Sequence, residues 1–132
     1  GLALAAMLEK NGILKSLSAY FNFADGINPV LLIVLLTALA IFISEVLSNL
    51  AMVTVFIPIV GVFAEQTNTA LFPLAMALTL GASLAFMMPV GTPPNAIVFG
   101  SGYLKIKQMV RIGFVLNIIS LILISVFIVF LH

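Results

Sequence analysis

The feature that most constrains this chain is a long uncharged run at its carboxyl end, Ile112–Leu131. At ~1.5 Å per residue these twenty residues make a helix of ~30 Å, which matches the hydrocarbon thickness of a bilayer. The composition agrees, because 64% of the residues are hydrophobic and only 7% are charged. A soluble domain keeps about a quarter of its residues charged. These features predict an all-α integral membrane protein.

Two shorter apolar arms flank a polar segment earlier in the chain. The first arm, Val30–Ile43, makes a helix of only ~21 Å, and the second, Leu50–Ala64, is about as long. Between them lies the sequence SEVLSN, residues 44–49. Non-helical backbone at membrane depth is tolerated where it lines a cavity. We therefore predict that residues 29–64 form a re-entrant helical hairpin with a polar tip at 44–49. The alternative is one tilted or kinked helix of ~50 Å with the polar residues at its middle.

Residues 89–95, PVGTPPN, predict a break in the next apolar helix. Pro93 and Pro94 have no N–H, so the carbonyls four residues earlier lose their helical partners. Gly91 permits backbone angles that other residues avoid, and Asn95 can cap a new half-helix. Such a break presents carbonyl oxygens that suit a small cation and a helix N-terminus that suits an anion.

The remaining segments set the expected topology. Residues 1–28 predict the end of a spanning helix followed by an interfacial helix, and residues 65–111 a discontinuous transmembrane helix with a basic segment at its end. Lys105, Lys107 and Arg111 place residues 105–111 in the cytoplasm. The final helix, 112–132, then ends outside. A hairpin tip and a helix break, both polar near the midplane, are typical of a secondary transporter.

The segments SEVLSNLAMVTVFIPI and AFMMPVGTPPNAIVFGSGYLKIKQMVRIGFVLNI resemble the carboxyl-terminal repeat of the divalent anion:sodium symporter family. This likeness covers nearly the whole chain. It implies one half of an inverted-repeat, multi-pass transporter in a bacterial inner membrane or plasma membrane, with an elevator-like movement. It also implies a missing N-terminal repeat, a homodimer at full length, sodium as the coupling ion and no other cofactor. The substrate would be a dicarboxylate, citrate or sulfate.

The resemblance also implies a site. The family's Ser-Asn-Thr tip motif matches Ser48 and Asn49, with Leu50 departing from the threonine. The substrate carboxylate would be bound by Ser48, Asn49, Thr92 and Pro93. Sodium would be bound by Ser44, Leu47, Asn49 and Gly91, largely through backbone carbonyls. Leu50 removes one hydroxyl donor, which bears on the choice of anion and on its affinity.

Other interpretations compete with these. Glu45 is either functional or paired structurally with a residue of the missing half. Asn117, Ser120 and Ser125 are expected to pack helices. The net charge of +1 argues against nucleic acid, and no pattern of residues predicts an enzyme. The alternative function is a non-transporting membrane subunit or a channel-like protein with a re-entrant loop.

Overall fold

The computed structural model describes residue 10 and residues 27–131 of the chain. In these residues all regular structure is helical, without a strand. After the single described residue Lys10, the helices are α3 (Pro29–Ser44), α4 (Asn49–Gln66), α5 (Leu71–Ser83), α6 (Pro93–Gly100) and α7 (Ile106–Leu131). The predicted helix end and interfacial segment within residues 1–28 lie outside the described residues, apart from Lys10, Ile27 and Asn28.

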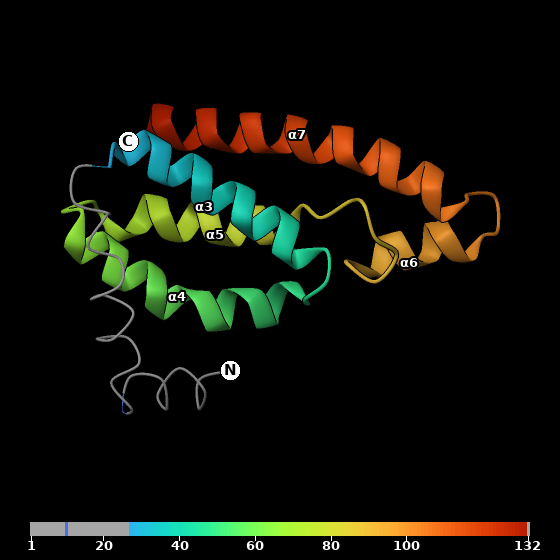
Figure 1. Ribbon diagram of the computed structural model, residues 1–132, viewed down its shortest axis with the longest axis horizontal. Helices are drawn as coiled ribbons and strands as arrows, with labels where there is room; N and C mark the ends of the chain where they lie inside the picture. Colours follow the sequence, from blue (N-terminus) through green and yellow to red (C-terminus); the bar gives the residue numbers. More distant parts are fainter. Residues whose placement is uncertain (1–9, 11–26, 132) are drawn as a thin grey trace.

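Helices α3 and α4 form a helical hairpin rather than one continuous helix (Figure 1). Asn28 caps the start of α3, because its side-chain oxygen accepts a hydrogen bond of 2.9 Å from the backbone N–H of Val30. The helix ends at Ser44, and Ser48 caps the start of α4 by accepting from the N–H of Ala51 at 3.3 Å. The last residue of the turn, Ser48, is therefore the N-cap of α4, a position at which serine is favoured.

Helix α5 lies at the centre and packs against α3, α4 and α7. Its buried residues Leu74, Ala77, Leu78 and Ala82 belong to one core cluster with residues of the three neighbouring helices. The approach to α3 is close, since a Cβ added at Gly81 would lie 2.9 Å from the Cβ of Ala40. A small residue is therefore required where the two helices cross.

The discontinuous helix is interrupted earlier than its prolines predict. Helix α5 ends at Ser83, residues 84–92 are not helical, and α6 begins at Pro93. The residue that caps α6 is Thr92 rather than Asn95, because the Thr92 hydroxyl accepts from the N–H of Asn95 at 3.5 Å. The prolines occupy the first turn of α6, where no N–H is needed.

The apolar surface of the described residues is consistent with the predicted membrane protein. Within the described residues, α4 and α7 are long and apolar enough to cross a bilayer. Large hydrophobic side chains are exposed along α7, among them Ile112, Leu123 and Phe130. Helix α7 extends past the end of the hairpin to the region of α6 (Figure 1).

Candidate functional site

The hairpin tip is attached to the interrupted helix by a buried carboxylate, Glu45. Its side chain is only 4% exposed. One carboxylate oxygen accepts from the backbone N–H of Met87 at 2.9 Å, and the other accepts from that of Met88 at 2.8 Å. These N–H groups have no helical partner because α5 has ended. Glu45 therefore compensates for the missing helical hydrogen bonds.

Asn117 brings α7 into the same network. Its amide nitrogen donates to Glu45 at 2.6 Å, and its amide oxygen accepts from the N–H of Phe86 at 3.1 Å. Glu45 thus has hydrogen-bond partners within this chain. Asn117 was predicted only to pack helices. Its fully buried side chain also hydrogen bonds both the tip and the unwound segment.

Asn95, in α6, also hydrogen bonds the unwound segment. Its amide nitrogen donates to the carbonyls of Ala85 at 2.8 Å and Met88 at 3.0 Å. A buried amide that satisfies two carbonyls replaces hydrogen bonds that a continuous helix would supply. Neither Asn95 nor Asn117 was predicted as a site residue. The sequence signal that could have identified them is the presence of two amides and one acid in apolar segments. Such groups require hydrogen-bond partners when they are buried.

The four predicted residues of the tip have different environments. Ser44 is buried at the end of α3, where its hydroxyl donates to the carbonyl of Ile41 at 2.9 Å. Leu47 is 42% exposed in the turn, and Ser48 is exposed as the cap of α4. Asn49 is half-buried, and its side-chain oxygen is buried without a hydrogen-bond partner. This oxygen can accept a hydrogen bond or coordinate a cation.

The three predicted residues of the break follow one another. Gly91 is buried, and its N–H donates to the carbonyl of Met88 at 3.1 Å. Thr92 is half-buried, and Pro93 is exposed as the first residue of α6. The expectation of unusual backbone angles at Gly91 is wrong, because its φ is not positive. Space at Gly91 is limited, since an added Cβ would lie 3.3 Å from the carbonyl oxygen of Met88 and 3.4 Å from a carboxylate oxygen of Glu45.

The arrangement offers oxygen ligands and helix N-termini. Ser48 and Thr92, from the tip and the break, are the caps of α4 and α6. The N-terminal end of a helix carries partial positive charge, which favours an anion. Among the described residues, no group of three or more His, Cys, Asp and Glu side chains could hold a metal ion. A cation here would have to be bound by carbonyl, hydroxyl and amide oxygens, which suits a hard ion.

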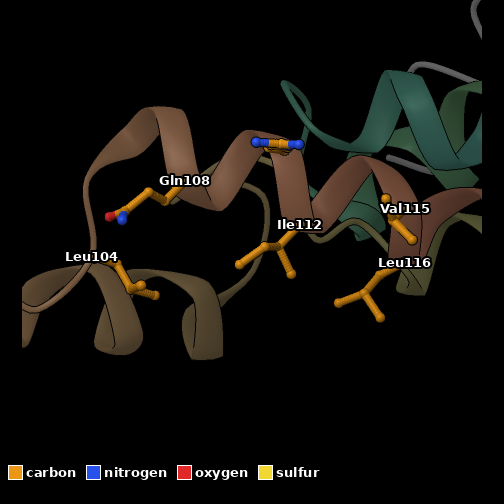
Figure 2. Close-up of a pocket in the computed structure, with 6 residues that line it drawn as sticks. Leu104, Gln108, Ile112, Val115 and Leu116 are labelled. Carbon is orange, nitrogen blue, oxygen red and sulfur yellow. The ribbon is translucent and has the colours of Figure 1, made fainter.

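A separate hollow of about 490 Å³ lies at the start of α7. Figure 2 shows Leu104 and Gln108 at one end of it, with Ile112, Val115 and Leu116 following along the helix. Arg111 completes the lining. The hollow contains no residue of the tip or the break, so it does not belong to the candidate site.

The chain is similar to known sodium-dependent transporters. The family described as the sodium:sulfate symporter transmembrane region matches residues 1–131. A sodium-dependent dicarboxylate transporter, SdcS, of Staphylococcus saprophyticus is 35% identical over 131 residues, which is 99% of this chain and 25% of the relative. SdcS of Staphylococcus aureus is 38% identical over 94% of the chain and 24% of the relative. An uncharacterized transporter of Haemophilus influenzae is 41% identical over 95% of the chain and 27% of the relative.

Proposed function

The chain belongs to the divalent anion:sodium symporter family, and from this premise we propose that it is part of a sodium-coupled carrier of di- or tricarboxylate anions. It spans about a quarter of the curated relatives it matches. It would therefore be part of the second repeat rather than a whole half of the carrier. The first repeat would supply the rest of the substrate site, and the complete protein would be a homodimer.

The observation that carries the proposal is the junction between tip and break. Two non-helical segments, 45–48 and 84–92, are joined by the bonds from Met87 and Met88 to Glu45. Unwound backbone in a membrane is tolerated where it lines a cavity. Such a junction of two interrupted helices is where secondary transporters bind their ions and substrates.

The depth of the tip along α7 supports a re-entrant hairpin. Glu45 contacts α7 at Asn117, which lies between Ile106 and Leu131, the ends of the helix. Along the helix axis, at ~1.5 Å per residue, Asn117 is ~17 Å from Ile106 and ~21 Å from Leu131. If α7 spans the bilayer, the tip then lies close to its midplane. The basic residues 105–111 would be cytoplasmic, and the end of α7 would be outside.

We assign sodium to Ser44, Leu47, Asn49 and Gly91. Asn49 supports this assignment because its buried side-chain oxygen lacks a donor in the described structure. A sodium ion would satisfy that oxygen together with backbone carbonyls of the tip and of Gly91. The substrate carboxylate would be bound by Ser48, Asn49, Thr92 and Pro93, beside the N-termini of α4 and α6.

Uptake by the full-length protein in proteoliposomes tests the function. An inward sodium gradient should drive accumulation of succinate, citrate or sulfate, and replacing sodium with potassium should abolish it. The three anions separate the substrate classes that the family includes. A downhill flux that ignores the sodium gradient would instead indicate the channel-like alternative. Absence of any sodium-dependent binding would indicate a non-transporting subunit.

A further inference from the structure

Glu45 is a buried carboxylate that accepts three hydrogen bonds. The donors are the N–H groups of Met87 and Met88 and the amide of Asn117, at 2.6 to 2.9 Å. An ionised carboxylate offers about four acceptor positions and no donor, so three of its positions are used. Every contact of this side chain therefore requires it to accept.

Glu45 and Asn117 together hold the backbone between α5 and Gly91. In a continuous helix, the N–H groups of residues 86–88 would donate to carbonyls four residues earlier. Here Asn117 accepts from Phe86, and Glu45 accepts from the next two residues. The unwound path is thus stabilised by side chains of α7 and of the tip, which come from 31 to 43 residues away in the sequence.

We propose that Glu45 is a positioning residue for the sodium site, an inference that rests on the proposed function. Its backbone lies directly after Ser44 and two residues before Leu47, on the tip side of that site. Its carboxylate reaches the break side, where Met88 donates to it and the carbonyl of Met88 accepts from Gly91 at 3.1 Å. One side chain thus sets the distance between the two groups of sodium ligands.

The side chain at position 45 must provide two hydrogen-bond acceptors at its end. Glutamine has nearly the same shape, but one of its two terminal atoms is an NH₂ group that only donates. In Glu45→Gln this group would face an N–H donor in either orientation, because donors face both carboxylate oxygens. At least one of the bonds to the unwound segment would be lost. Groups that orient metal ligands typically contribute about 10-fold to 100-fold to metal affinity.

The first test measures sodium dependence of succinate uptake by the full-length protein. Glu45→Gln should raise the half-saturating sodium concentration about tenfold or more, with a smaller change in the maximal rate at saturating sodium. The matched control is Glu65→Gln, which makes the same change at an exposed acid near the end of α4. This control should match the wild type. An unchanged sodium dependence in Glu45→Gln would overturn the proposal.

The second test does not depend on transport. Spin labels would be placed at Val46 and Val90, which are 78% and 82% exposed and lie beside the two ends of the junction. This chain has no cysteine, and any cysteine elsewhere in the full-length protein would be replaced. Dipolar electron paramagnetic resonance should give one narrow distance distribution in the wild type and in Glu65→Gln. Glu45→Gln should broaden it, and an equally narrow distribution would refute the positioning role.

Two further variants extend the test, and the first of them leaves Glu45 in place, so it covers the case in which Glu45→Gln does not fold. Asn117→Ala removes one of the three donors and should broaden the distribution less. The double variant Glu45→Gln with Asn117→Asp restores a donor–acceptor pair between the two side chains, so it should recover part of the sodium affinity. A wild type without sodium-driven uptake, together with variants that still broaden the distances between the two labels, would contradict the proposed function. That result would nevertheless support the role of Glu45 in holding the tip against the unwound segment. If uptake is normal and none of these variants alters the distances, Glu45 does not position the site.

Discussion

Glu45 and Asn117 are 72 residues apart in the sequence and share a buried hydrogen bond of 2.6 Å. The bond joins the tip of the α3–α4 hairpin to the central part of α7, and both side chains also bond the backbone that unwinds after α5. Three segments of the chain therefore meet at one polar cluster inside an apolar protein.

Gly113→Ala should destabilise the protein. A Cβ at this position would overlap the carbonyl oxygen of Phe86 and lie 2.6 Å from its carbonyl carbon. These are backbone atoms held by Asn117, so they cannot move aside as a flexible side chain could. We expect a loss of ~1–3 kcal/mol, the usual cost of overpacking.

Thermal unfolding in detergent measures the effect of Gly113→Ala. Gly61→Ala is the matched control, because a Cβ at Gly61 meets no atom within 4 Å. In a helix this control should be neutral or slightly stabilising. Equal unfolding temperatures for the two variants would show that the contact between α7 and the unwound segment is not close in solution.

Gly91→Val should weaken sodium binding more than Gly91→Ala. An added Cβ would lie 3.3 Å from the carbonyl oxygen of Met88 and 3.4 Å from Glu45. Alanine would need a shift of a few tenths of an ångström, whereas the two branches of valine would displace the Glu45 carboxylate. Sodium affinity from calorimetry on the full-length protein checks this order. Gly100→Val is the control, since that position has open space around it. Equal sodium affinities for both Gly91 variants would show that the branches of valine do not disturb the sodium site.

Asn49→Ala should weaken succinate binding without lowering the stability of the ligand-free protein. The Asn49 side-chain oxygen is buried and unpartnered, so its removal eliminates a polar atom that contributes no bond in the described structure. The Asn49 NH₂ group would donate to the substrate carboxylate, so succinate affinity should fall by ~1.5–3 kcal/mol, the value of a hydrogen bond to a charged group. Thermal unfolding with and without sodium and succinate separates the two effects.

Asn95→Ala is the comparison for Asn49→Ala, because the same substitution there removes two hydrogen bonds to backbone carbonyls. That variant should lose ~1–3 kcal/mol of stability even without ligand. If Asn49→Ala were destabilised to the same degree and bound succinate normally, Asn49 would be structural and the assigned substrate site would be misplaced.

A cysteine at Lys107 should react with a membrane-impermeant maleimide only from the cytoplasmic side, and one at Glu65 only from the outside. Both positions are exposed, and the chain contains no cysteine of its own. The physical basis is the excess of basic residues at 105–111, which favours retention in the cytoplasm. Labelling of Lys107→Cys from outside in intact cells would reverse the proposed topology.

The local chemistry of the sequence predicted much of the architecture. The uncharged run at 112–131 falls within α7, and the polar segment after Ile43 interrupts the apolar arms as expected. The interruption near Gly91 was predicted because prolines prevent a continuous helix in any surroundings. The seven residues assigned to sodium and substrate remain predictions that follow from family resemblance.

Tertiary structure decided where the helix stops and what replaces its hydrogen bonds. Helix propensity allows α5 to continue to Met88, but the helix ends at Ser83. Glu45, Asn95 and Asn117 offer the backbone of 85–88 other partners from three different elements. Hydrophobic pattern and proline position are properties of neighbouring residues, so the sequence by itself determined a helical membrane protein with a tip and a break. The pairing of distant polar side chains depends on which helices pack together, and only the folded structure could decide it.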